Sequence, residues 1–126
     1  MTKHLPQRAH IEQFGAGGFR FAGMSHQGSL LVLPSGMRAW RPTAPDDVTP
    51  EDLSALLAER GGIDFVLVGT GTGMQRLPPA VAAVLKDHGI AHEVMATGPA
   101  VHVYNVTVQE GRRVAAALIA VDRANA

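Results

Sequence analysis

The sequence contains no cysteine. It therefore has no disulfide, no thiolate metal site and no thiol nucleophile, a composition typical of a reducing compartment such as the cytoplasm. It also has no apolar run close to the roughly 20 residues of a membrane-spanning helix, and its N-terminus lacks the apolar core of a signal peptide. We therefore expect a cytoplasmic protein that reaches a membrane only through a partner.

No charge of one sign dominates the chain, because 11 basic residues balance 11 acidic residues. No net field attracts nucleic acid or anionic lipid, so we expect neither nucleic-acid binding nor direct membrane insertion. Aromatic residues make up only 5% of the chain, but apolar residues make up 46%, which is enough for a globular core. The length suits one domain, which we place over residues 11–126 after a flexible N-terminal tail over residues 1–10.

The clearest structural pattern lies between Asp64 and Met95. Four apolar residues, Phe65 to Val68, are bounded by Asp and Gly and predict a strand covered on both faces. A glycine-threonine loop follows, then a helix that the two prolines at 78 and 79 open and Gly89 closes. A second strand ends at Met95. This order predicts a crossover unit with two parallel strands, and the loops at their carboxyl ends are a usual place for ligands.

The N-terminal half predicts short strands and then one helix. Segments around Ile11–Gly15, Phe19–Phe21, Ser29–Leu33 and Met37–Trp40 are separated by turn signals and predict an antiparallel meander. A helix then starts near Thr49, with Pro50 in its first turn and leucines at spacing three and four.

The C-terminal third gives conflicting signals. Thr97 and Pro99 suit a helix start, whereas the alternating valines between Val101 and Val108 favour a strand. The apolar segment from Val114 to Val121 is compatible with a helix on propensity alone. Local signals leave both assignments open.

No residue constellation specifies a reaction. The loop Gly69–Gly73 resembles a dinucleotide-binding loop, but Met74 stands where the third glycine belongs, and no acidic ribose ligand follows. Ser25 and His26 are adjacent but lie in no nucleophile context. The six histidines show no zinc-ligand spacing. We therefore expect no metal and no cofactor, and we lean towards a protein without catalytic activity.

Three polar residues near the C-terminal third invite two interpretations. Tyr104 is the only tyrosine, Asn105 follows it, and Arg112 could place charge over the loop mouths. In one interpretation they help to bind an anion. In the other, Tyr104 and Asn105 fasten their segment to the sheet by hydrogen bonds, as buried polar groups normally do, and Arg112 is solvated.

An ordered set of residues from about Ile11 to Val121 resembles a known family. These residues are Gly18, Phe19 and Gly23; Leu31 to Pro34; Trp40; Leu67 to Gly71; Pro78; Gly89 and Ile90; Glu93 to Thr97; and Ala100, Tyr104, Asn105 and Arg112. The family contains the mitochondrial assembly factor 3 of respiratory complex I (NADH:ubiquinone oxidoreductase) and an adipogenesis-associated protein, together with small single-domain proteins of unknown function in bacteria and archaea. Val103 departs from the threonine expected before the tyrosine.

The resemblance implies a three-layer α/β domain. It has a central mixed β-sheet, helices on its faces and a small β meander at one side. The resemblance also makes residues 97 to about 109 a helix and residues 113–121 a strand antiparallel to its neighbours. It implies no established catalytic activity. The mitochondrial member acts with other assembly factors on complex I intermediates at the inner membrane, which implies protein partners and, in a bacterium, a cytoplasmic location peripheral to that membrane.

Two functional hypotheses follow. The first is a non-enzymatic interaction protein that helps to assemble a membrane-bound respiratory complex through an exposed apolar patch of Phe14, Met37 and Trp40; burial of Trp40 in the core is the competing interpretation. The second is a small-molecule or anion site, and in its strongest form an enzyme, at the carboxyl ends of the parallel strands. The residues of that site would be Gly69, Thr70, Gly71, Thr72, Thr97, Tyr104, Asn105 and Arg112. The oligomeric state stays open.

Overall fold

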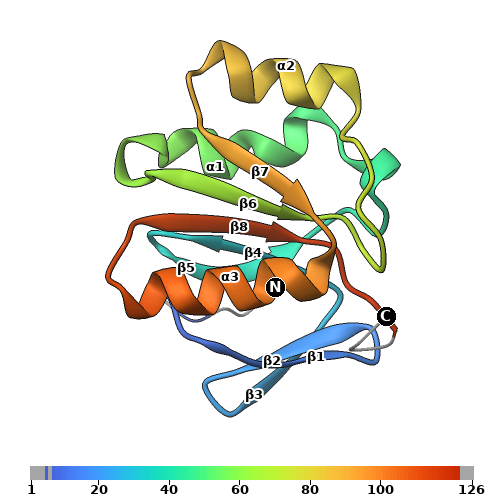
Figure 1. Ribbon diagram of the computed structural model, residues 1–126, viewed down its shortest axis with the longest axis vertical. Helices are drawn as coiled ribbons and strands as arrows, with labels where there is room; N and C mark the ends of the chain where they lie inside the picture. Colours follow the sequence, from blue (N-terminus) through green and yellow to red (C-terminus); the bar gives the residue numbers. More distant parts are fainter. Residues whose placement is uncertain (1–4, 6, 123–126) are drawn as a thin grey trace.

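A five-stranded mixed sheet forms the central layer of the computed structural model, which describes Leu5 and residues 7–122 (Figure 1). Its strands are β4 (Ser29–Leu33), β5 (Gly36–Trp40), β6 (Phe65–Gly69), β7 (His92–Met95) and β8 (Val114–Leu118), in the order β5-β4-β8-β6-β7. β6 is parallel to β7 and to β8, whereas β4 is antiparallel to β5 and to β8. The predicted α/β fold with a central mixed sheet is confirmed.

The crossover predicted from the sequence is present. β6 leads through α2 (Pro79–Asp87) to β7, and the two strands pair in parallel from Val66 opposite His92 to Gly69 opposite Met95. β6 is buried almost throughout because its neighbours β7 and β8 cover both edges and helices cover both faces.

Helical segments cover one face of the sheet. The predicted single helix after Thr49 is a 3₁₀ turn, η2 (Pro50–Leu53), followed by the short α1 (Ser54–Ala58) and a second 3₁₀ turn, η3 (Arg60–Gly62). An earlier 3₁₀ turn, η1 (Pro45–Asp47), lies between β5 and η2. Trp40 and the leucines of η2 and α1 pack with α2 against alternate residues of the central strands.

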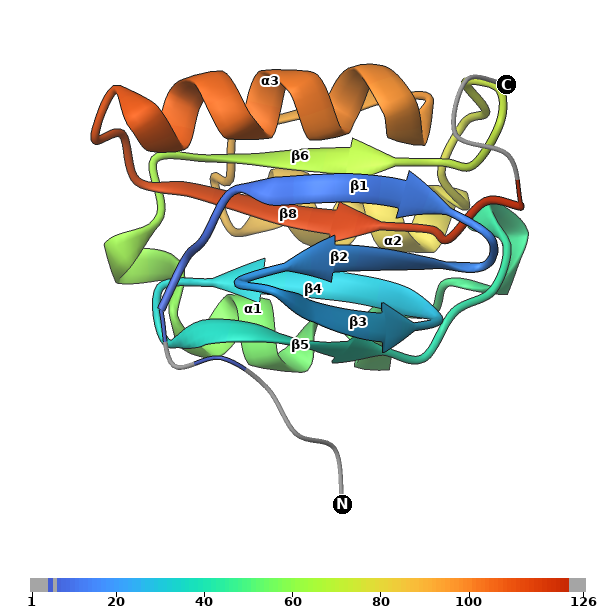
Figure 2. The same ribbon diagram turned by 90° about the horizontal axis from the view of Figure 1, so that it is seen from below.

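The opposite face carries α3 (Thr97–Gln109) and a small three-stranded sheet (Figure 2). The helix predicted there is confirmed, and its buried residues Ala100, Val101 and Tyr104 recur at helical spacing. Burial against β6 and β8 therefore outweighs the strand preference of the alternating valines.

The small sheet consists of β1 (Ile11–Gly15), β2 (Gly18–Phe21) and β3 (Met24–Gln27), all antiparallel. The meander at one side of the domain is thus confirmed, but its membership is corrected. Ser29–Leu33 and Gly36–Trp40 form a hairpin of the central sheet instead, because both faces of β4 are buried. The third strand of the meander is β3, whose polar sequence Met-Ser-His-Gln gives no apolar alternation.

The last strand also needs one correction. β8 was expected to run antiparallel to its neighbours, and it does so with β4, but it runs parallel to β6 on its other side. Its position between the β4–β5 hairpin and the β6–β7 crossover pair makes it the strand that joins the antiparallel and parallel halves of the sheet.

The predicted flexible tail falls partly on residues 1–4 and 6, which lie outside the described residues. The described part of the segment makes defined contacts. Leu5 exchanges two backbone hydrogen bonds with Met37 on β5, at 3.1 and 2.8 Å, and the Arg8 Nε donates to the Val114 carbonyl oxygen at 2.9 Å. The boundary at residue 10 stays a prediction.

Candidate functional site

The predicted rim at the carboxyl ends of the parallel strands brings Thr70 and Thr97 together, but their hydroxyls are already hydrogen-bonded to backbone groups of the chain. Thr97 Oγ1 donates to the Ile119 carbonyl oxygen at 2.7 Å and accepts from the Gly71 N–H at 2.9 Å. Thr70 Oγ1 donates to the Gly73 carbonyl oxygen at 2.7 Å and accepts from the Gln75 N–H at 3.1 Å. Both threonines are buried. These hydroxyls stabilise the loop after β6 rather than face a ligand.

Gly69 has a packing role at the same rim. A Cβ atom at this position would lie 2.9 Å from Thr97 Oγ1, 3.0 Å from the Thr97 Cα and 3.0 Å from Leu118 Cδ2. Contacts this short force the neighbouring atoms to shift, so glycine is strongly favoured where the start of α3 crosses the end of β6. Gly71 has a φ of 106°, a backbone conformation that favours glycine. The glycines of the loop are thus explained by close packing and turn geometry.

Tyr104 and Asn105 connect α3 to the N-terminal segment. The Tyr104 hydroxyl donates to the Ala9 carbonyl oxygen at 2.9 Å, and burial raises the pKa of Tyr104. The side-chain amide of Asn105 bonds to both backbone polar groups of Ile11 in β1. Its Oδ1 accepts from the Ile11 N–H at 2.8 Å, and its Nδ2 donates to the Ile11 carbonyl oxygen at 3.0 Å. These are the contacts that the structural interpretation of the two residues anticipates.

Arg112 lies at the other end of β6 from the threonines. Its guanidinium carbon sits 4.6 Å from the centre of the Phe65 ring, and Phe65 is the first residue of β6, whereas Thr70 follows the last. Five strand residues separate the two ends by roughly 16 Å. The eight residues proposed as a ligand site therefore lie in three separate places. Tyr104 and Asn105 lie at the contact between α3 and β1, Arg112 lies at the start of β6, and the other five lie at the rim: Gly69, Thr70, Gly71, Thr72 and Thr97. Thr72 is exposed.

The predicted apolar patch of Phe14, Met37 and Trp40 is wrong as an exposed surface. Met37 is fully buried and Trp40 is 7% exposed. The two residues are three apart on β5, so their side chains leave opposite faces of the strand, and they belong to the two separate cores. The Trp40 Nε1 donates to the Asp52 carbonyl oxygen at 3.0 Å, which confirms the core interpretation of the tryptophan. Phe14 alone remains partly exposed.

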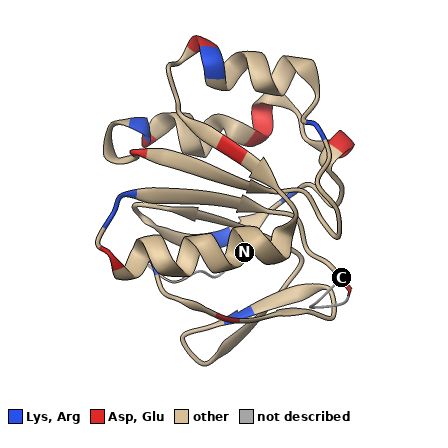
Figure 3. Ribbon diagram, in the orientation of Figure 1, with Lys and Arg blue, Asp and Glu red and all other residues tan. Residues whose placement is uncertain are grey.

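A groove that the sequence analysis missed lies between β1 and α3. It has a volume of about 530 Å³ and is lined by residues 11–14 of β1 and by Gly98, Val101, His102 and Asn105 of α3. One signal in the sequence could have pointed to it: no Asp, Glu, Lys or Arg occurs between Val94 and Gln109. The whole of α3 is therefore free of formal charge, although it forms an outer layer of the domain (Figure 3).

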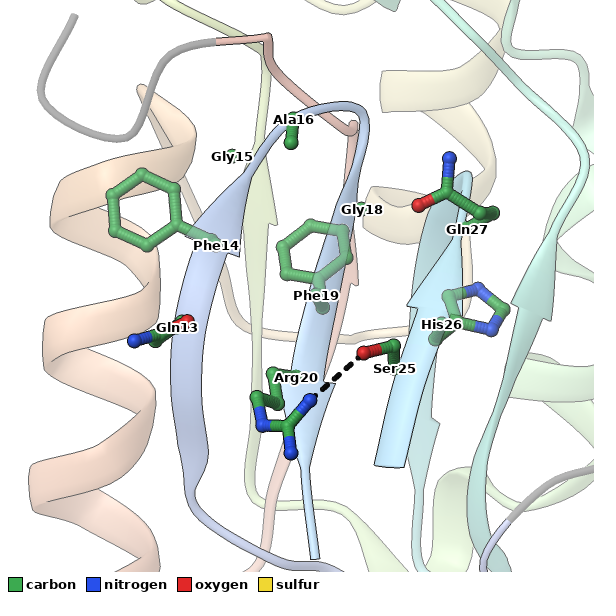
Figure 4. A pocket seen from close by; sticks show the side chains of 10 residues that line it. All are labelled: Gln13, Phe14, Gly15, Ala16, Gly18, Phe19, Arg20, Ser25, His26 and Gln27. Atoms are coloured by element: carbon green, nitrogen blue, oxygen red, sulfur yellow. Dashed lines mark hydrogen bonds between the residues drawn. The ribbon is translucent and has the colours of Figure 1, made fainter. Parts of the chain in front are cut away.

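A smaller hollow of about 330 Å³ lies over the small sheet (Figure 4). Its polar side chains come from β1, β2 and β3, and the charged one, Arg20, already has partners within the chain. Arg20 donates to the Ser25 hydroxyl at 3.0 Å and lies 3.7 Å from the Glu12 carboxylate. His26 makes a 2.9 Å contact with the Ser29 carbonyl oxygen. This hollow offers no free charged group to a ligand.

In the described part of the chain, no group of three or more His, Asp or Glu side chains could hold a metal ion. No helix among residues 5 and 7–122 has the length and apolar character needed to cross a membrane.

Sequence comparison assigns the chain to a family. The family described as "Protein of unknown function (DUF498/DUF598)" matches residues 11–119, most of the chain, and the protein belongs to this family. An uncharacterized protein of Rhodobacter capsulatus is 39% identical over 86% of this chain and 82% of its own length. The mouse protein named NADH dehydrogenase [ubiquinone] 1 alpha subcomplex assembly factor 3 is 33% identical over 94% of this chain. The chain spans 64% of the length of that mouse relative. The predicted family resemblance is confirmed.

Solved structures agree with this assignment. A crystal structure titled as an outer membrane protein from Bartonella henselae superimposes with a TM-score of 0.89 at 45% identity, covering 94% of this chain and 99% of the other. The solution structure of a Rhodopseudomonas palustris protein gives a TM-score of 0.82 at 43% identity, covering 94% and 88% of the two chains. A Bordetella pertussis protein described as a Mth938-like domain gives 0.76 at 26% identity, covering 91% and 87%.

Proposed function

We propose that this protein is a non-enzymatic assembly factor that binds protein partners, and that its partners are intermediates or assembly factors of a respiratory complex I. The proposal draws its partner from the mouse relative, which is 33% identical over 94% of this chain and carries the name of a complex I assembly factor. We place the protein in the cytoplasm, at the inner membrane through its partners.

The observation that supports protein binding best is the lack of charge on α3. The centre of a protein–protein interface is depleted in charged residues, whereas the solvent-facing side of an outer helix usually carries them. On α3 that side presents His102, Val106 and Gln109, and Val106 is 42% exposed. We call this side, together with the adjoining groove, the α3–β1 surface.

The alternative of an anion or small-molecule site has less support. Thr70, Thr97, Tyr104 and Asn105 direct their polar atoms to backbone groups of the same chain, and Arg112 stacks on Phe65 far from the rim. A binding site requires several free polar groups that converge on one cavity. We therefore assign partner binding to the α3–β1 surface rather than to the predicted rim site.

Affinity capture from the native membrane fraction tests the proposal. The tagged full chain is expressed in its source organism, and complex I subunits and assembly factors among the captured proteins are measured by mass spectrometry against a tag-only control. We expect complex I subunits to be enriched, and membranes of a strain lacking the gene to lose NADH:ubiquinone oxidoreductase activity. Normal complex I levels in that strain, with no subunit captured, would contradict the proposal.

Two charge substitutions locate the binding surface. Val106→Glu places a carboxylate on the exposed side of α3 and should reduce capture at least tenfold. Ala83→Glu places the same charge on the exposed side of α2, in the opposite layer of the domain, and should leave capture unchanged. Equal loss with both variants would indicate a general effect rather than binding through the α3–β1 surface.

A further inference from the structure

β1 is an edge strand that lies beside a helix. It pairs with β2 on one side only, and its other side faces α3 across the groove (Figures 2 and 4). An edge strand next to a helix is the arrangement in which PDZ domains add an extended peptide to a sheet. The arrangement therefore favours strand addition as the binding mode.

The turn after β1 fixes which backbone groups face the groove. Ala16 and Gly17 have φ values of 53° and 79°, which define a two-residue type I′ turn. Gly15 lies opposite Gly18 across this two-residue turn, and the residues that flank such a turn form a hydrogen-bonded pair. The next pair, Phe14 opposite Phe19, is then a non-hydrogen-bonded pair. The N–H and C=O of Phe14 therefore point away from β2 and into the groove.

A side chain already imitates a neighbouring strand at one end of this edge. Asn105 gives and takes a hydrogen bond at Ile11, as the peptide of an added strand would. The structure thus satisfies the outward backbone groups of Ile11 from α3. A β-bulge between Ile11 and Gln13 turns the backbone groups of Phe14 to the same side as those of Ile11, and these groups face the open part of the groove, between β1 and the residues Gly98 and His102.

The charged residues that line the groove determine which kind of partner segment it can bind. Glu12 is the only formally charged residue that lines the groove, and it is already shared with Arg20 at 3.7 Å and with the Gly23 N–H at 3.3 Å. A basic segment finds no free carboxylate there, and an acidic segment would be repelled by Glu12. An uncharged segment meets neither cost and matches the uncharged helix that forms the other wall.

We infer that the groove binds an extended, uncharged segment of a partner protein, which pairs with the Phe14 edge of β1 and packs its side chains against Val101 and His102. This inference rests on the proposed function, because it specifies how the protein partner is held. The main-chain hydrogen bonds supply affinity, and the α3 wall of the groove, formed by Gly98, Val101 and His102, selects side chains of the segment.

A random seven-residue peptide library displayed on phage, selected against the full chain, supplies the probe. The strongest peptide is synthesised with a fluorescent label, and its binding is measured by anisotropy. We expect uncharged sequences rich in β-branched residues, micromolar affinity, and at least tenfold weaker binding after His102→Glu. Ala83→Glu is the matched control and should bind as the wild type does.

Two further measurements separate strand addition from other contacts. Amide hydrogen exchange should show the Phe14 N–H exchanging at least tenfold more slowly when the peptide is bound. A peptide methylated on its pairing backbone nitrogens should bind at least tenfold more weakly than the parent. Selection of no peptide, selection of charged peptides, or unchanged exchange at Phe14 would each overturn the inference.

The inference and the proposed function can fail separately. If the chain captures complex I subunits and His102→Glu does not reduce that capture, the groove inference is wrong while the proposed function stands. If peptides bind the groove as expected but no complex I component is captured, the proposed function is wrong and the groove remains a peptide-binding site.

Discussion

Replacement of Gly69 by alanine should destabilise the domain without disturbing any surface. The new Cβ would lie 2.9 Å from Thr97 Oγ1 and 3.0 Å from both the Thr97 Cα and Leu118 Cδ2. Two of these atoms belong to the first residue of α3, and the third belongs to a fully buried leucine of the central strand. Neither neighbour can move without shifting the helix or the core.

The magnitude follows from the cost of overpacking. One extra methyl group in a closely packed core typically costs about 1–3 kcal/mol, and contact with a backbone atom places this site at about 2–3 kcal/mol. For a chain of 126 residues, that loss lowers the melting temperature by about 6–12 °C. Because φ at Gly69 is not positive, backbone strain contributes nothing to the expected effect.

Thermal unfolding followed by circular dichroism, together with urea titration, measures the effect. Gly73→Ala is the matched control, because among the described residues no atom outside Gly73 and its two chain neighbours lies within 4 Å of a Cβ at that position, and its φ is not positive. It should change the free energy of unfolding by less than about 0.5 kcal/mol. Equal stability of Gly69→Ala and Gly73→Ala would refute the argument that close packing of α3 requires Gly69.

Three other predictions concern polar contacts. Thr97→Val keeps the side-chain shape but leaves the buried N–H of Gly71 unpaired, so the free energy of unfolding should fall by about 1–3 kcal/mol in urea titration; an unchanged value would contradict this. Asn105→Leu removes both hydrogen bonds to the first residue of β1 and should speed amide exchange in that strand at least tenfold, while exchange in β6 stays the same. Hydrogen bonds from Arg41 lower the pKa of Asp52 from 3.8 to about 2, so the ion pair should stabilise the fold by at most about 1 kcal/mol above pH 4 and lose this effect between pH 4 and 2. Asp52→Asn should remove that pH dependence, and identical acid unfolding profiles of the two proteins would show the prediction to be wrong.

Local sequence signals were enough for the crossover unit. The apolar run Phe65–Val68 has no polar face, so it must be covered on both sides, and the prolines at 78 and 79 leave no ambiguity about where α2 can begin. The parallel pairing of β6 and β7 follows from that order. Each signal is contained within a few residues, which is why the sequence alone sufficed.

The helix α3 could not be assigned from local signals. Its valines alternate as in a strand, and only the arrangement of Ala100, Val101 and Tyr104 against the sheet decides for a helix. The family resemblance supplied what propensity could not. The strand β3 was missed for a related reason, because its residues are mostly exposed and carry no apolar period.

The candidate site depended on contacts that span most of the chain. Tyr104 and Asn105 bond to residues 95 and 94 positions away, and no spacing rule connects them with Ala9 and Ile11. Polar side chains in an apolar segment therefore suggested a ligand site as readily as a structural contact. The opposite orientation of Met37 and Trp40, in contrast, follows from their odd spacing on one strand and could have been foreseen.

The position of β8 in the sheet has a consequence for how the chain folds. This strand is made after all the other strands, yet it separates β4 from β6 and is buried at every residue. Until residue 118 has been synthesised, the hairpin and the crossover pair have no common partner, and both present apolar faces to their surroundings. We therefore expect the chain to complete its native sheet only after β8 has been synthesised, slowly and with a period of aggregation risk that dilution or a holding chaperone would relieve.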